Sequence, residues 1–134
     1  MRNLFFAVTI SVVLSSCEVD YVSSGTYLLD NQSSYDVVVV LKHEEMDAEI
    51  SKRVLKNTLD TMYEIHTDPS VPQTPLLIDY IRVYSISENA DEQLLYEQNQ
   101  PIDETPWNID RKYYKGRWYH TVNTFVFTDD MARR

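Results

Sequence analysis

The sequence predicts an all-β protein: an antiparallel β-sandwich, immunoglobulin-like or transthyretin-like, of about seven or eight strands. Three observations lead to this fold class. Four consecutive valines, 37–40, favour an extended chain and lie in a segment with apolar side chains on both faces. Turn-forming residues recur about every 8 to 12 residues. No segment has a convincing helical period, and the sequence contains no internal repeat or low-complexity segment.

Four strands are expected in the first half of the domain. The most secure is 35–41 (YDVVVVL), because apolar residues on both faces, with Tyr35, Val37, Val39 and Leu41 on one of them, are typical of a central strand. The acidic segment 43–49 (HEEMDAE) is expected to be a solvated loop, with a helical turn as the alternative. The expected strands are 26–30, 35–41, 50–56 and 61–67, with turns at 31–34 and 57–60.

The second half begins after a proline-rich connection, 68–75, and is expected to hold strands at 76–85, 94–97, 107–114 and 117–128. If Lys115-Gly116 forms a two-residue turn, Tyr113 faces Trp118 and Tyr114 faces Arg117. One face of this hairpin is then core. Its expected members are Ile109, Tyr113, Trp118 and Val122. The apolar alternation of the last strand changes near Asn123, which predicts a β-bulge there, with coverage of both faces of its second half as the alternative.

The N-terminus has the pattern of an export signal. A basic start, Met1-Arg2-Asn3, precedes the apolar run 4–14, which is shorter than the roughly 20 residues that a membrane-spanning helix needs. Leu14-Ser15-Ser16-Cys17 resembles the lipobox of bacterial lipoproteins, in which the cysteine is acylated, palmitate being one such acyl group, and becomes the new N-terminus. The alternatives are an ordinary signal peptide with an incidental cysteine, or a buried N-terminal strand.

The lipobox resemblance implies a domain organisation and a location. Residues 1–16 are then a lipoprotein signal peptide, 17–25 a tether with lipidated Cys17, and 26–134 a single β-sandwich domain. The expected location is the cell envelope, lipid-anchored at the outer membrane, with the periplasmic and the surface face both open. More than one acyl chain makes such an anchor durable, at about 0.8 kcal/mol per buried CH₂.

Composition excludes several classes of function. Acylation would use the only cysteine, which leaves no disulfide, no thiolate metal site and no cysteine nucleophile. The formal charge is −9, and loss of residues 1–16 removes Arg2 and no acid, so it becomes −10. Such a charge repels nucleic acid and anionic lipid surfaces. With only two glycines, Gly25 and Gly116, no phosphate-binding loop or nucleophile elbow is present, and no cofactor is expected.

The sequence predicts no catalytic or metal-ligating group of residues, and the protein is expected not to be an enzyme. The histidines are far apart and fit no ligand spacing. Adjacent acids are interpreted as solvated charge rather than as a glycosidase pair or calcium ligands. No feature sets up an activated serine or an oxyanion hole. The residues considered are His43, His66, His120, Glu44, Glu45, Asp103, Glu104, Asp129 and Asp130.

The best candidate for a binding surface is the aromatic segment 107–120 (WNIDRKYYKGRWYH). Neighbouring strand residues point to opposite faces, so its aromatic rings cannot all be core. The predicted outer face consists of Lys112, Tyr114, Arg117 and Tyr119 and would suit a sugar ring or a protein partner. The alternative is that another layer covers this face and the rings only pack.

Three features together resemble the small β-sandwich lipoproteins of Bacteroidetes, an uncharacterised family. They are the lipobox, the segment 30–40 (DNQSSYDVVVV) and the segment 119–130 (YHTVNTFVFTDD). The resemblance implies a fold and a location but no site residues. In addition, Asp60-Thr61-Met62 resembles the O-glycosylation sequence of extracytoplasmic proteins of that phylum, with Thr61 as the acceptor.

The expected function is therefore that of a membrane-anchored extracytoplasmic lipoprotein acting as a non-catalytic binding or structural accessory module. One alternative is a carbohydrate-binding lipoprotein that uses the exposed aromatic face. Another is an accessory protein or inhibitor of a cell-envelope enzyme that presents loops at one end of the sandwich. The expected partners are the membrane, through the lipid anchor, and a glycan or an envelope protein. Nucleic acid is not expected as a partner.

Overall fold

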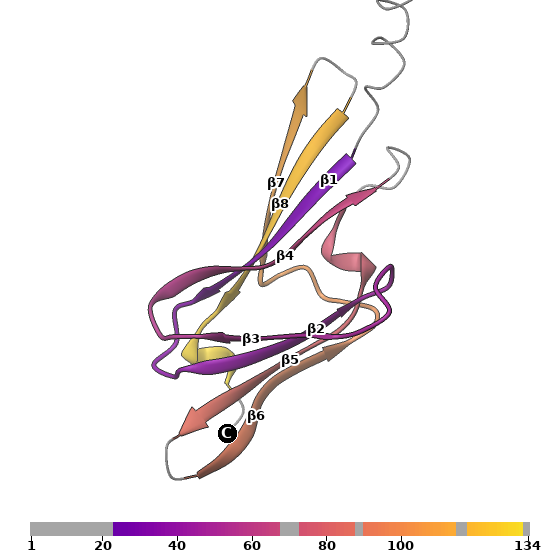
Figure 1. Ribbon diagram of the computed structural model, residues 1–134. Coiled ribbons are helices and arrows are strands. Elements are labelled where there is room, and N and C mark those ends of the chain that lie inside the picture. Colours follow the sequence, from indigo (N-terminus) through magenta and orange to yellow (C-terminus); the bar gives the residue numbers. More distant parts are fainter. Residues whose placement is uncertain (1–22, 68–72, 88–89, 115–117, 133–134) are drawn as a thin grey trace, which may run out of the picture.

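Two four-stranded sheets face each other in the computed structural model, which describes residues 23–67, 73–87, 90–114 and 118–132 (Figure 1). The strand order is β4-β1-β8-β7 in one sheet, called sheet A, and β3-β2-β5-β6 in the other, sheet B. This arrangement confirms the predicted β-sandwich. The strands are β1 (Ser23–Asn31), β2 (Val37–His43), β3 (Ile50–Val54), β4 (Thr58–Thr67), β5 (Ile78–Ser87), β6 (Ala90–Asn99), β7 (Trp107–Tyr114) and β8 (Trp118–Phe127).

One pairing departs from the predicted antiparallel pattern. The strands β1 and β8 are neighbours in sheet A and run parallel, from Ser23 opposite Tyr119 to Asn31 opposite Phe127. The other pairings are antiparallel. Parallel neighbours need a long connection, and here the strands between β1 and β8 supply it. The first and the last strand of the domain therefore begin at the same end of sheet A.

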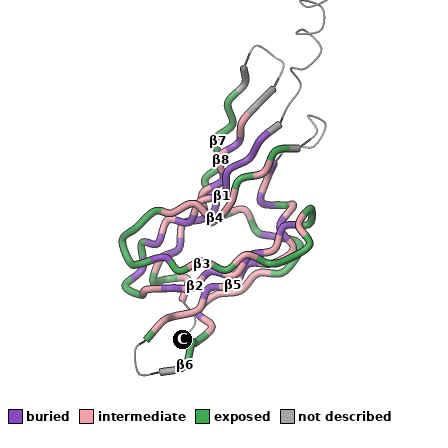
Figure 2. Tube along the Cα trace, in the orientation of Figure 1, coloured by how far each residue is buried: buried purple, intermediate pink, exposed green. Residues whose placement is uncertain are grey.

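The core lies between the two sheets, where Figure 2 shows the buried positions. In β2, residues 37, 39, 41 and 43 are buried and the residues between them are half-buried. This strand pairs with both β3 and β5, which confirms the prediction of a central strand. The prediction for Tyr35 is wrong: it precedes β2 and its side chain is 39% exposed. The largest fully buried hydrophobic side chains are Tyr27, Phe125, Phe127, Leu29, Leu41, Ile78 and Ile81.

Connections between strands differ in detail from the expected ones. The acidic segment after His43 is a loop and not a helix, which confirms the prediction. The 3₁₀ turn η1 (Pro75–Leu77) lies beside this loop, and the backbone N–H of Glu44 donates to the carbonyl oxygen of Leu77 (2.9 Å). The β3–β4 turn comes earlier than predicted, at 55–57. There Asn57 has a φ of 61°, which asparagine tolerates better than most residues. The strand β1 starts at Ser23, so residues 23–25 of the predicted tether belong to sheet A.

The predicted register of the β7–β8 hairpin is wrong by one residue. Tyr113 pairs with Tyr119, and Tyr114 with Trp118. Three residues, 115–117, therefore join the strands in place of the expected two-residue turn, and they lie outside the described residues. Two expected members of the hairpin core do not belong to it, since Ile109 is 41% exposed and Val122 is only half-buried. The side chains of the other two, Tyr113 and Trp118, lie outside the described residues.

The predicted bulge near Asn123 is absent from β8, whose register with both β1 and β7 is continuous. The apparent change in alternation came from the wrong turn length. With the observed register, β8 buries every second residue without interruption. These buried residues are Thr121, Asn123, Phe125 and Phe127.

Candidate functional site

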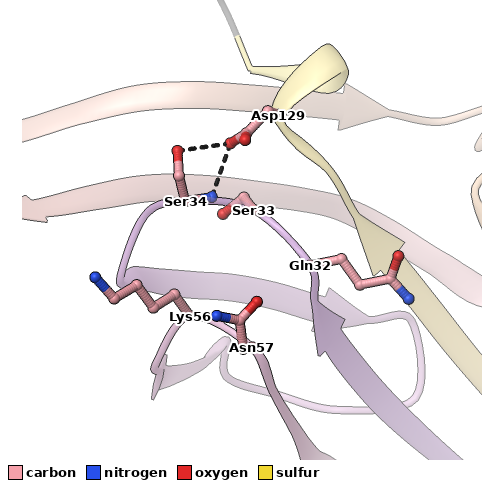
Figure 3. A pocket seen from close by; sticks show the side chains of 6 residues that line it. All are labelled: Gln32, Ser33, Ser34, Lys56, Asn57 and Asp129. Carbon is pink, nitrogen blue, oxygen red and sulfur yellow. Dashed lines mark hydrogen bonds between the residues drawn. The ribbon is translucent and has the colours of Figure 1, made fainter.

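A shallow polar pocket lies at the end of the sandwich where β1 and β8 finish (Figure 3). Its volume is about 360 Å³. Three connections meet here: the β1–β2 loop (32–36), the β3–β4 turn with the first residues of β4 (55–59), and the segment after β8 with the 3₁₀ turn η2 (Asp129–Met131). We call these three segments together the loop end. The residues that line the pocket are Gln32, Ser33, Ser34, Lys56, Asn57 and Asp129.

The buried side-chain amide of Asn31 links two of the three segments of the loop end. Its Nδ2 donates to the carbonyl oxygens of Tyr35 (2.8 Å) and Val54 (3.2 Å). Its Oδ1 accepts from the backbone N–H (3.1 Å) and the hydroxyl (2.7 Å) of Ser33. The backbone N–H of Asn57 donates to the carbonyl oxygen of Asn31 (2.8 Å). One fully buried residue therefore fixes the β1–β2 loop against the β3–β4 turn.

The pocket offers polar groups that make no internal bonds. Asp129 is engaged, because its Oδ1 accepts from the backbone N–H (2.8 Å) and the hydroxyl (2.9 Å) of Ser34 (Figure 3). The backbone N–H of Lys56 donates to Asp36 Oδ1 (2.9 Å). Within the described ranges, however, the Lys56 ammonium group and the Asn57 side-chain amide have no hydrogen-bond or ion-pair partner. These two groups remain available to a ligand.

Apolar side chains are exposed at the same end. Tyr35 is 39% exposed, Leu55 49% and Leu59 60%. Isolated exposed leucines are common on protein surfaces, but here three large apolar residues belong to the segments that surround a polar pocket. A mixed surface of this kind is typical of protein–protein and ligand-binding sites. The loop end can therefore bind a partner by apolar contact and by hydrogen bonds.

The predicted aromatic face lies mostly outside the described part of the chain, since the side chains of Tyr114 and Tyr119 are not described. Lys112 is exposed on β7, whereas Arg117 lies outside the described residues. Tyr114 pairs with Trp118, and Tyr119 pairs with Tyr113. Paired residues share a face and neighbours alternate, so positions 114 and 119 are on opposite sides of the hairpin. The one-residue difference in turn length is the reason.

His43, which fits no ligand spacing in the sequence, is fully buried at the end of β2. Its Nδ1 accepts from the backbone N–H of Glu45 (3.1 Å), so the ring proton is on Nε2, which donates to Gln73 Oε1 (3.2 Å). Burial lowers the pKa of His43, against the opposing effects of Glu45 and Gln73. The sequence did hold a signal for this burial, because position 43 is in phase with Val37, Val39 and Leu41.

The His43 side chain belongs to a buried polar cluster between the sheets. The Tyr27 hydroxyl donates to Gln73 Oε1 (3.3 Å) and to Thr74 O (3.0 Å), and the ring of Tyr27 stacks on that of Tyr63 at 4.6 Å. Burial is the main reason that the pKa of each of these tyrosines is raised. Tyr27, His43 and Gln73 are fully buried and joined by hydrogen bonds, so they stabilise the core and are closed to a substrate. The hydroxyl of half-buried Tyr63 has no hydrogen-bond partner.

His120 forms a second arrangement that the sequence did not reveal. Its Nδ1 is 2.6 Å from the hydroxyl of Ser24, and its Nε2 is 3.2 Å from the hydroxyl of Thr26. A serine–histidine pair is part of a hydrolase triad, but a triad also needs a carboxylate that orients the second nitrogen. Here the second nitrogen, Nε2, contacts the hydroxyl of Thr26 and not a carboxylate. The contact therefore ties β8 to β1, and only their unexpected parallel pairing brings the three residues together.

The remaining candidates are dispersed. His66, Glu44, Glu45 and Asp130 are exposed, and Glu104 is half-buried. The carboxylate of exposed Asp103 accepts from the N–H (3.0 Å) and the hydroxyl (2.6 Å) of Thr105, which lowers the pKa of Asp103. In the part of the chain that the structure describes, no group of three or more His, Cys, Asp or Glu side chains could hold a metal ion. The described residues also contain no helix that is long and apolar enough to cross a membrane.

Two predicted modification sites differ in how the structure bears on them. Thr61 lies on β4, the edge strand of sheet A, and is half-buried. Its carbonyl oxygen accepts from Lys52 Nζ (2.7 Å), and Lys52 also pairs with Asp60 (3.2 Å). Cys17 lies outside the described residues. Glycosylation at Thr61 and acylation at Cys17 both stay predictions.

Comparison with protein-family models, curated proteins and solved structures finds no match for this chain. The structure itself defines the class, an eight-stranded β-sandwich over the described residues with a polar pocket at its loop end. Function is therefore inferred from this geometry and from the N-terminal motif.

Proposed function

We propose that the protein is a membrane-anchored extracytoplasmic lipoprotein that acts as a non-catalytic binding module and contacts its partner through the loop end. The direction of β1 carries the proposal. This strand begins at Ser23, shortly after the lipobox cysteine, and ends at Asn31, where the loop end starts. A nine-residue strand spans about 30 Å. Acyl chains on Cys17 would therefore leave the loop end facing away from the lipid.

The anchor is tested by metabolic labelling with palmitate and by cell fractionation. We expect the wild-type protein to carry the label and to sediment with envelope membranes after a high-salt wash. Cys17→Ser should lose the label and become soluble, because the acyl chains supply the durable attachment. Ser15→Ala keeps a small residue in the lipobox and is the matched control, with label and sedimentation unchanged. A labelled or salt-resistant membrane-bound Cys17→Ser protein contradicts the anchor.

The loop end is tested by site-specific photo-crosslinking in cells. A photoreactive residue at position 59, which is 60% exposed, should form a discrete adduct with a partner. The control is position 76, where Leu76 is 51% exposed in η1, outside the loop end. We expect the adduct from position 59 to be lost in Tyr35→Ala and to be absent from position 76. Equal adducts from both positions, or none from position 59, contradict a binding role of the loop end.

A carbohydrate ligand is the second candidate, and the polar lining of the pocket favours it. Free amide and ammonium groups beside serine hydroxyls can recognise a hydroxylated ligand, and the volume is in the range of small-ligand sites. Binding on a glycan array that disappears in Lys56→Ala/Asn57→Ala but persists in the control Ser51→Ala/Arg53→Ala would support it. Loss only in Tyr114→Ala/Tyr119→Ala would assign the ligand to the β7–β8 hairpin instead.

The absence of catalytic activity is also a proposal. It is supported by the closed hydrogen-bonding of His43 and His120, which leaves neither ring positioned beside the pocket as a base. Hydrolysis of a generic ester, peptide or glycoside substrate by the purified protein, abolished by a substitution in the described residues, would contradict it.

A further inference from the structure

The outer face of sheet B carries apolar side chains that sheet A does not cover. In β2, Val38 and Val40 alternate with the buried positions of the same strand, so they point outward. Val38 is opposite Tyr84 of β5, and Tyr84 is opposite Leu94 of β6. These four side chains are half-buried, and Figure 1 shows sheet A on one side of sheet B only. We call them the outer patch.

Charged groups beside the outer patch are already paired within the chain. Arg82 Nε donates to Glu97 Oε2 (2.8 Å), and the guanidinium of Arg82 lies 4.3 Å from the ring centre of Tyr80. Lys42 Nζ pairs with Asp79 Oδ2 (3.1 Å). A charge that keeps its partner is less costly to remove from water than an isolated one. An apolar centre with a paired polar rim is the usual anatomy of a protein–protein interface.

The two edge strands of sheet B carry opposite charge. The strand β3 contains Lys52 and Arg53 and no acid, whereas β6 contains Asp91, Glu92 and Glu97 and no base. Arg53 is exposed and, within the described ranges, has no ion-pair partner. Asp91 and Glu92 are exposed as well. Sheet B is therefore positive along one edge and negative along the other, with the outer patch between them.

We infer that the outer patch is the interface with a second copy of this chain, packed face to face about a two-fold axis parallel to the strands of sheet B. This rotation places β3 of one copy over β6 of the other, so the basic edge meets the acidic edge twice. A two-fold axis across the strands would instead stack β3 on β3 and β6 on β6, with like charges together. Packed sheets lie about 10 Å apart, a distance at which side chains of the two patches interdigitate.

Charge is the reason that a second copy suits this face. Copies of a chain with a formal charge of −9 repel each other on average. Across the outer face, the bases of each copy instead approach the acids of the other. An axis along the strands also preserves their direction, and β2 starts and β3 ends at the loop end. The dimer therefore presents two loop ends side by side, which is a bivalent arrangement.

Photo-crosslinking of the full chain in cells tests the interface and its orientation. A photoreactive residue at position 40 should form an adduct with twice the mass of the chain, attached to β5 of the other copy. From position 51, an exposed and outward position on β3 opposite Val40, the attachment should be in β6. Position 28 is the matched control, because Leu28 is a half-buried aliphatic residue on the outer face of sheet A. It should give no adduct of that mass.

Charge substitutions measure the forces at this interface, by sedimentation equilibrium of the full chain in detergent. Val40→Lys places an unpaired charge in the interface twice and should lower the dimerisation constant by about 100-fold or more. Leu28→Lys adds the same charge on the other sheet and should leave the constant unchanged. Arg53→Glu should lower it by about 10-fold at low salt and less at high salt, because exposed charge pairs are weak and screened. Circular dichroism checks that each variant is folded.

Several outcomes would overturn the inference. An adduct from position 40 with a chain of another mass would assign the outer patch to a different protein, and the absence of an adduct would leave it without an occupant. Equal adducts from positions 28 and 40 would indicate random collision. A crosslink from position 51 to β3 of the other copy contradicts the axis. A folded Val40→Lys protein that still dimerises like the wild type excludes the outer patch as the interface.

Discussion

Gln73 lies directly over Gly25: a Cβ atom at position 25 would be 2.5 Å from the Cβ and 2.7 Å from the Cγ of Gln73. Gly25 is in β1, and Gln73 lies in the proline-rich connection between β4 and β5. Gln73 is fully buried and accepts hydrogen bonds from Tyr27 and His43. The missing side chain at position 25 therefore lets the connection sit against sheet A and complete the buried polar cluster.

We expect Gly25→Ala to lower the free energy of unfolding by about 1–3 kcal/mol, the usual cost of forcing atoms into a filled site. Urea denaturation measures this loss. The companion variant is Gln73→Gly, which removes the atoms that the new methyl group would meet. If the overlap is the cause, the double variant loses less than the sum of the two single changes. Strict additivity contradicts this explanation.

We expect stability to fall on mild acidification because of His43. Its pKa is lowered in the folded protein, whereas the unfolded chain binds a proton at about pH 6.5. The contribution of this residue is thus fully present above about pH 6.5 and is lost as the pH falls, by at most about 1.4 kcal/mol per pH unit. Nearby Glu44, Glu45 and Asp79 raise the pKa of His43 and narrow this window.

The measurement for His43 is the urea midpoint between pH 7.5 and 5. His43→Leu should flatten this dependence even though it lowers stability at every pH. His66→Gln, at an exposed position, should keep the wild-type slope. An unchanged slope in His43→Leu would show that another group titrates.

We expect Asn31→Ala to destabilise the protein by about 2–4 kcal/mol, because it removes four hydrogen bonds and leaves buried backbone groups without partners. Hydrogen exchange should also become faster in residues 32–36 and 55–58, which this amide holds together. Gln32→Ala, at an exposed neighbouring position, is the control and should change stability by less than about 0.5 kcal/mol. Unchanged exchange at 55–58 would contradict the linking role of Asn31.

Substitution of valine for each of two threonines on adjacent strands should change the stability of the protein in opposite directions. The Thr121 hydroxyl is buried and has no hydrogen-bond partner, so Thr121→Val removes an unpaired polar atom and should raise stability by about 1 kcal/mol. The Thr26 hydroxyl contacts His120, and Thr26→Val should lower stability by a similar amount. Thermal unfolding of both variants compares them directly, and shifts in the same direction contradict the assignment.

The sequence predicted local structure well where the residues of a single segment are enough to indicate its surroundings. The valines of β2 require an extended chain with two covered faces, and the structure places this strand between β3 and β5. The prediction of a loop rather than a helix after His43 is also confirmed. The register of the β7–β8 hairpin was predicted wrongly, because the sequence is compatible with a two-residue and with a three-residue connection. A shift of one residue exchanges the two faces of a strand. The pairing assumed for the predicted face around Tyr114 and Tyr119 is wrong for this reason.

The candidate site was less predictable than the fold, since its parts come from three distant segments. No local pattern indicates that Ser34 donates to Asp129, or that Asn57 and Gln32 line the same pocket. The burial of His43 was equally hard to predict from composition, although the position of this residue in phase with the valines of β2 pointed inward.

By itself, the sequence determined the all-β class, the central position of β2 and the N-terminal motif, because each depends on neighbouring residues. Tertiary structure alone decided the parallel pairing of β1 with β8, the burial of His43 against Gln73, and the meeting of the loops around the pocket. These depend on contacts between residues far apart in the chain, whose free energy is gained only when both sheets have formed. The same pairing places the starts of β1 and β8 at one end of sheet A and the loop end at the other.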